Sequence, residues 1–148
     1  FHAAMGNQIN RDPALALQVM QAVARIAPQV IVFCMAGTII ESAAREAGLP
    51  TLTLFLVDRA YQQDGRLVPR GLPGAVITAE AQVRARVRQF LNEGTVTTIE
   101  GAEIAVRAGS ILIHSDTPGS VELAGLVCSE IRASGHTLAP AAEVLSQQ

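Results

Sequence analysis

The sequence predicts an α/β fold built on a mainly parallel sheet. Apolar runs rich in β-branched residues alternate along the chain with segments whose apolar residues recur at helical spacing. One of these runs, 30–35, is continuously apolar, which is typical of a strand buried on both faces of a parallel sheet. The chain has 148 residues, and a domain of about that size hides roughly 68–70% of the surface that its unfolded chain exposes. We therefore expect residues 1–148 to form a single domain with its own core.

Prolines, glycines and capping residues divide the first half of the chain. Asp12 can cap a helix that begins at Pro13, because Asp accepts hydrogen bonds from the first turn and Pro is tolerated there. Gly48 and Pro50 then end a second, shorter helix. In order, this half is predicted to contain a helix over 13–27, a strand over 30–35, a helix over 39–47 and a strand over 51–56.

The second half opens with a long irregular stretch, 57–77, that is rich in Pro and Gly. Thr78 then begins a long helix, which Gly94 ends. Residues 102–108 are ambiguous, and we expect one or two helical turns there. The remaining predicted elements are a strand over 95–99, a strand over 110–114, a helix that begins at Pro118 and ends at Gly135, a strand over 136–139 and a terminal helix from Pro140.

The composition excludes several classes of function. The net charge is −2, with one Tyr and no Trp, whereas nucleic-acid binding needs a basic surface or stacking aromatic residues. No apolar run approaches the roughly 20 residues that span a bilayer. Cys34 and Cys128 lie far apart and form no CxxC motif, which favours two buried thiols in a reducing compartment. We therefore expect a cytoplasmic protein without a nucleic-acid or membrane partner.

Polar side chains follow two of the predicted strands. Asp58 and Arg59 come shortly after one strand, and His114 and Asp116 lie at the end of another. Because the carboxyl ends of parallel strands meet at one edge of a sheet, we expect these four side chains to lie close together. Such groups can carry out general acid–base catalysis, bind a carboxylate or hold a metal.

Each of these residues also has a purely structural interpretation. Asp58 and Arg59 could form a surface ion pair or cap the turn that follows them. Asp116 could cap the helix that begins at Pro118, and His114 could be a core histidine. The sequence contains no glycine-rich dinucleotide or phosphate loop, no nucleophile elbow and no His or Cys cluster with metal-ligand spacing.

Other charged side chains are interpreted as solvated. Arg84 and Arg88 share one face of the helix that begins at Thr78, and a solvated face is the simplest explanation of their spacing. His136 follows Gly135 on an outer strand, so we expect it to be exposed.

Three stretches of the sequence match family motifs. Residues 57–77 read VDRAYQQDGRLVPRGLPGAVI and resemble the ADRxYxxDGxLVPR stretch of the LamB/YcsF family. Residues 114–120 read HSDTPGS and resemble that family's HGDTPGA stretch. His2 and Asn7 match its KPHGxLYN stretch in register. The resemblance covers essentially the whole chain.

The resemblance to the LamB/YcsF family implies both a fold and an activity. The family is the A subunit of the bacterial 5-oxoprolinase, which opens 5-oxoproline (pyroglutamate) to glutamate at the expense of ATP, together with the B and C subunits. Its fold is a distorted seven-stranded (β/α) barrel, similar to glycoside hydrolase and deacetylase barrels. The family's N-terminal motifs are absent here, and the chain begins at Phe1. We therefore expect the C-terminal part of an incomplete barrel, which pairs with a second copy or belongs to a longer polypeptide.

The resemblance and the strand-end positions together suggest roles for individual residues. The expected catalytic residues are Asp58, His114 and Asp116, with either carboxylate as the base for water and His114 as the acid or the group that orients the base. ATP is expected on one of the partners, because this chain has no recognisable phosphate loop, and a metal requirement is left open. The expected substrate-binding residues are Arg59, as first choice for the substrate carboxylate, then Arg70, His2 and Asn7.

Two other functions stay open at this point. One is a metal-dependent hydrolase that acts alone on a lactam or amide, by analogy with deacetylases of similar fold. The other is a non-catalytic interaction subunit, which the absent N-terminal motifs suggest. The altered KPHG stretch points the same way, because Phe1 stands in place of Pro and Ala3 in place of Gly. The chain also departs from the family motifs at Gly6, which replaces Tyr, and at Ser115, which replaces Gly.

Overall fold

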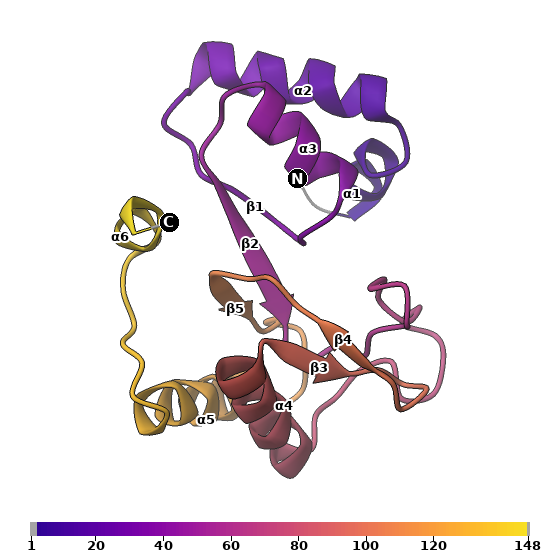
Figure 1. The fold of residues 1–148 in the computed structure, drawn as a ribbon. Helices are drawn as coiled ribbons and strands as arrows, with labels where there is room; N and C mark the ends of the chain where they lie inside the picture. Colours follow the sequence, from indigo (N-terminus) through magenta and orange to yellow (C-terminus); the bar gives the residue numbers. More distant parts are fainter. Residues whose placement is uncertain (1–2, 148) are drawn as a thin grey trace. The chain divides into compact units, whose positions relative to one another are not determined.

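The computed structural model describes residues 3–147, which divide into two compact units (Figure 1). The first unit contains the described residues up to 54, together with 108–110 and those from 140 onward. The second unit contains 55–107 and 111–139. The single domain expected over 1–148 stays a prediction.

Within the described residues of the first unit there are four helices, and two of them pack against each other. The second helix begins as predicted, because the Asp12 side chain accepts a hydrogen bond from the Leu15 N–H and Pro13 occupies the first turn. Its buried face meets the third helix around Met20 and Ala44, which form the centre of this unit's core. The helices are α1 (Ala3–Ile9), α2 (Pro13–Ile26), α3 (Ile39–Glu46) and α6 (Ala141–Ser146).

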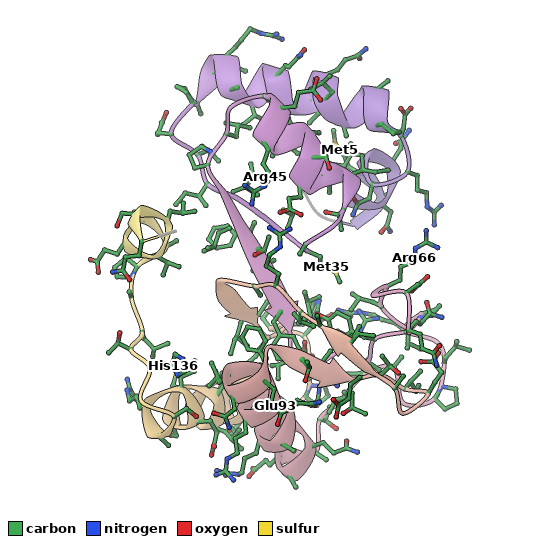
Figure 2. All side chains as sticks on the ribbon, in the orientation of Figure 1. Met5, Met35, Arg45, Arg66, Glu93 and His136 are labelled. Carbon is green, nitrogen blue, oxygen red and sulfur yellow. The ribbon has the colours of Figure 1, made fainter. Side chains whose placement is uncertain are left out.

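A buried glutamate fixes the start of α3. Glu41 is almost fully buried, and its carboxylate accepts a hydrogen bond of 2.7 Å from the Gly37 N–H. The same carboxylate forms an ion pair of 3.1 Å with Arg45 one turn later; Arg45 is labelled in Figure 2. The turn before α3 is therefore tied to the helix itself.

The central sheet has the strand order β1-β2-β5, with β1 at Val32–Cys34, β2 at Thr51–Leu56 and β5 at Ser110–Leu112. β1 and β2 pair in parallel, and Val32 lies opposite Thr51. The mainly parallel α/β fold is therefore confirmed. The expectation that the run 30–35 is buried on both faces is wrong at Val30 and Phe33, which are 42% and 49% exposed. Among the described strands, β1 pairs with β2 alone and forms an edge of the sheet. No described element covers the exposed side of Phe33 there.

In the second unit two helices pack side by side, as Figure 1 shows: α4 (Glu80–Glu93) and α5 (Ser120–Ala133). Arg84 and Arg88 share one face of α4, as their spacing indicates, but the interpretation of this face as merely solvated is wrong. Both guanidinium groups form ion pairs with the buried carboxylate of Glu130 on α5, at 2.6 Å in the case of Arg88. The pair of helices is therefore joined by a charged clamp as well as by apolar packing.

Two short predictions in this unit are wrong. The helical turns expected over 102–108 are not formed, and β4 (Glu103–Ala105) instead pairs antiparallel with β3 (Thr95–Thr97). The reversal is made at Gly101, whose φ of 88° suits a tight turn, so the two segments form a hairpin. The strand expected over 136–139 is irregular backbone instead, although His136 is exposed there, as expected (Figure 2).

None of the helices within residues 3–147 has the length and apolar character needed to cross a bilayer.

A matched pair of glycine substitutions tests this local geometry. Gly94 ends α4 with a φ of 66°, so Gly94→Ala is expected to lower the free energy of unfolding by about 1 kcal/mol. Gly125 lies exposed within α5 with open space around it, so Gly125→Ala is expected to raise it by about 0.5–1 kcal/mol. Urea titration of the complete gene product measures both changes. If Gly94→Ala raised the free energy of unfolding as Gly125→Ala is expected to do, residue 94 would not need the left-handed conformation of the cap.

Candidate functional site

The candidate site lies in the second unit, where two strands end. The Val57 N–H donates to the Leu112 carbonyl at 3.2 Å, which places the residues after β2 beside those after β5. Asp58 follows the first of these strands and His114 follows the second. The strand-end argument therefore located two neighbouring residues that are 56 positions apart in the chain.

The Asp58 carboxylate is fully buried and accepts hydrogen bonds from three donors. Its Oδ2 accepts from the His114 backbone N–H at 3.0 Å and from the Thr117 hydroxyl at 2.7 Å. The His114 Nδ1 lies 3.0 Å from Oδ1 and 3.1 Å from Oδ2. Burial by itself raises the pKa of Asp58, but the hydrogen bonds from His114 and Thr117 outweigh it and leave this pKa below 3.8. Asp58 is therefore ionised at neutral pH.

An ionised Asp58 determines the tautomer of His114. A carboxylate only accepts hydrogen bonds, so the imidazole Nδ1 must carry the hydrogen that lies between the two groups. The neutral ring then has its lone pair on Nε2. The His114 side chain is 18% exposed, whereas Asp58 is fully buried. The Asp58–His114 pair is thus a dyad in which the carboxylate orients the ring and Nε2 can accept a proton or bind a metal.

Thr117 is a member of the site that the sequence interpretation missed. It is buried, its hydroxyl donates to Asp58, and its backbone N–H donates to the His114 carbonyl at 3.1 Å. The turn that contains these contacts ends at Gly119, whose φ of 74° leads into α5. The motif HSDTPGS contained the signal, because a small hydroxyl residue three positions after the histidine can bond the same carboxylate.

Arg59 organises the long loop between β2 and α4. Its side chain is buried, with Nε donating to the Ala75 carbonyl at 3.2 Å and Nη2 to the Val68 carbonyl at 2.7 Å. Burial, and secondarily the charge of Arg70, lowers the pKa of Arg59. These contacts fold the loop back on its apolar residues and favour a structural role. The substrate-binding role expected for Arg59 stays a prediction.

Arg70 and Asp116 form an ion pair near the dyad. The Arg70 Nη1 and the Asp116 Oδ2 are 2.9 Å apart, and both side chains are about half or more exposed. The hydrogen bond from Arg70 lowers the pKa of Asp116. The pair joins the loop over 57–77 to the turn after β5. An exposed guanidinium in this place is accessible to an anionic ligand, whereas that of Arg59 is enclosed.

The last two expected site residues belong to the N-terminal segment. His2 lies outside the described residues. Asn7 is exposed on α1 in the first unit, and its substrate-binding role stays a prediction. Over residues 3–147, no group of three or more His, Cys, Asp or Glu side chains is arranged to hold a metal. The sequence interpretation also missed Arg86 on α4, which is buried and binds the carbonyls of both residues that flank Asp58.

Known proteins similar to this chain support the motif resemblance. The model of the LamB/YcsF family matches residues 1–146. The 5-oxoprolinase A subunit of Pectobacterium atrosepticum is 67% identical over 146 residues, which are 99% of this chain and 57% of that protein. The second 5-oxoprolinase A subunit of Agrobacterium fabrum is 61% identical over 143 residues, which are 97% of this chain and 56% of that protein.

A solved structure is also similar. The crystal structure of the lactam utilization protein from Thermus thermophilus matches with a TM-score of 0.83 and 32% identity, over 93% of this chain and 54% of that one. This match is consistent with the expected distorted (β/α) barrel. The chain spans about half the length of the relatives that it matches.

Proposed function

Because the chain belongs to the LamB/YcsF family, we propose that it is part of the A subunit of an ATP-dependent 5-oxoprolinase. The enzyme would hydrolyse 5-oxoproline to glutamate in the cytoplasm, together with the B and C subunits. The relatives from P. atrosepticum and A. fabrum are both named as A subunits, which implies a complex of several subunits for those proteins. The substrate, the need for ATP and the partners are proposals for this chain.

The observation that carries a hydrolytic role is the buried Asp58–His114 dyad. Opening a lactam with water requires a group that accepts a proton from the attacking water. The dyad has the required form, because Asp58 holds Nδ1–H and leaves Nε2 as the basic nitrogen. We therefore assign the base to His114 and the orienting role to Asp58. With this assignment Asp58 does not act on water directly, whereas the sequence suggested Asp58 as a possible base for water.

The other residues contribute binding and orientation. As water attacks the lactam carbonyl, its proton passes to the Nε2 of His114, and the buried charge of Asp58 stabilises the imidazolium that forms. The imidazolium can then donate the proton to the departing ring nitrogen. The substrate carboxylate would pair with Arg70, whose exposed guanidinium contacts Asp116 in the turn after β5.

ATP fits one of the partners better than this chain. The lactam amide is stabilised by resonance, and ATP, when bound, would supply the free energy for its opening by phosphorylation of the amide oxygen, with ADP and phosphate as the final products. The sequence contains no glycine-rich phosphate loop of the usual kinds. We therefore place the ATP site on one of the B and C subunits and confine the role of this chain to the dyad and the substrate carboxylate.

A direct assay tests the proposed function. The complete gene product, co-purified with its partners, is incubated with 5-oxoproline with and without ATP, and released glutamate is measured. Release that depends on ATP is the expected result. No release from a sample whose intact mass shows a complete polypeptide would overturn the proposed substrate.

A metal-dependent hydrolase that acts alone is the second candidate, and one observation favours it. A carboxylate that binds the Nδ1–H of a histidine is also the usual partner of a metal-ligating histidine, whose Nε2 then faces the metal. This candidate requires turnover without ATP or partners that a chelator abolishes and one divalent metal restores. Turnover that needs both ATP and the partner proteins would exclude it.

A further inference from the structure

Arg86 is a buried arginine that the proposed chemistry does not use directly. It belongs to α4, is 8% exposed and donates three hydrogen bonds to backbone carbonyls. Its Nε binds the Val57 carbonyl at 3.1 Å, and its Nη2 binds the Arg59 carbonyl at 2.8 Å. Its Nη1 binds the Thr97 carbonyl on β3 at 3.2 Å. One guanidinium therefore holds the carbonyl groups of the two residues that flank Asp58 in the chain.

Two aromatic rings help to keep this guanidinium in place. Its central carbon lies 5.7 Å from the centre of the Phe55 ring and 5.8 Å from that of Tyr61. The Tyr61 hydroxyl in turn accepts the Leu56 N–H at 2.9 Å, which joins the aromatic residues to the end of β2. Burial lowers the pKa of Arg86, yet an arginine stays protonated in proteins. The cation is thus held by the carbonyls at its edge and by the two rings beside it.

The backbone at Asp58 is held by other bonds only in part. The Val57 N–H donates to Leu112, and the Asp58 carbonyl accepts from the Ile77 N–H at 2.9 Å. The two carbonyls on either side of Asp58 instead depend on Arg86. A dyad requires hydrogen bonds with a narrow range of direction, and small displacements of such groups reduce turnover strongly.

We propose that Arg86 is a positioning residue of the dyad: by binding both carbonyls that flank Asp58, it sets the direction in which the Asp58 carboxylate meets His114. The effect on turnover rests on the proposed function, whereas the effect on the histidine ring does not. The fork of an arginine is required, because a lysine ammonium cannot reach these three carbonyls from one rigid plane.

Arg86→Lys and Arg86→Met in the complete gene product with its partners test the proposal. Two quantities are measured: kcat and KM for 5-oxoproline, and the tautomer of the His114 ring by long-range ¹H–¹⁵N NMR of the ¹⁵N-histidine-labelled protein. We expect kcat to fall about 10–100-fold with KM nearly unchanged, and the Nδ1–H tautomer of His114 to give way to a mixture. Arg88→Met is the matched control, because Arg88 lies on the same helix and binds Glu130 instead. It is expected to keep both the rate and the tautomer.

The outcomes separate this inference from the proposed function. A mixed tautomer with unchanged turnover would support the positioning role and contradict the use of the dyad in catalysis. A normal tautomer in Arg86→Lys would overturn the inference, whatever the rate. Circular dichroism checks folding, and if neither variant folded, Arg86 would be a structural residue and the inference would be wrong.

Discussion

Replacing His114 with glutamine is expected to lower kcat for 5-oxoproline hydrolysis by about 10²–10⁴-fold, which is the usual contribution of a positioned general base. Glutamine keeps a polar side chain of similar size but has no nitrogen that accepts a proton near neutral pH. The Asp58 carboxylate would still be buried and hydrogen-bonded to the backbone N–H of residue 114 and to Thr117, so the fold should be retained. Steady-state kinetics of the complete gene product with its partners, with thermal denaturation as a folding check, measure the effect.

Two controls make the His114 experiment specific. His136→Gln changes a histidine that is exposed beyond α5, and it is expected to leave kcat unchanged (Figure 2). Asp116→Asn tests the other base that the sequence suggested. Asp116 is exposed and paired with Arg70, so its substitution is expected to change turnover roughly tenfold at most. A loss in Asp116→Asn as large as that in His114→Gln would move the base to Asp116, and full turnover in His114→Gln would exclude the dyad as base.

Local signals in the sequence predicted most of the fold. Asp12 and Pro13 begin α2 as their chemistry dictates, and Gly94 ends α4 in a left-handed conformation. The strand expected over 95–99 is confirmed by β3, but its partner β4 was missed, because three residues are too few for an alternating pattern to be recognised. The segment after Gly135 has the composition of a strand, but no neighbouring strand pairs with it among residues 3–147. Pairing is a tertiary property, and a short apolar run does not encode it.

The same distinction applies to the candidate site: some of its features follow from the order of elements in the sequence, and others depend on tertiary contacts. Asp58 and His114 were identified because the ends of parallel strands converge, and this rule requires only the order of the elements. The roles of the two residues were not accessible, because burial and hydrogen-bond direction decide which group is the base. The charge of Arg59 suggests a substrate ligand, whereas its bonds to the Val68 and Ala75 carbonyls depend on a loop folded over many residues. Arg86 was missed for the same reason, since it reaches the backbone beside Asp58 from a separate helix.

The Asp58→Asn substitution should separate the orienting role of this residue from its structural role. An asparagine oxygen in the place of Oδ2 would keep the hydrogen bonds from the His114 N–H and the Thr117 hydroxyl. Its amide group would then face the His114 Nδ1 as a donor, and the ring would have to carry its hydrogen on Nε2 instead. The base would be lost although the fold is kept. We expect kcat to fall about 10³–10⁴-fold, with KM changed much less.

The same variant should also change the acid stability of the protein. The pKa of Asp58 in the folded state lies below its ordinary value of 3.8, so its ionised form stabilises the fold at higher pH. This contribution is complete above about pH 4 and is lost as the pH falls through the folded-state pKa. The asparagine of the variant cannot titrate. Below about pH 4 the free energy of unfolding of the variant should therefore depend less on pH than that of the wild type. Urea titrations from pH 7 down to pH 3 measure the difference between the two proteins. A constant difference over this range would show that folding does not lower the pKa of Asp58, and the hydrogen bonds from His114 and Thr117 would then not favour its ionised form.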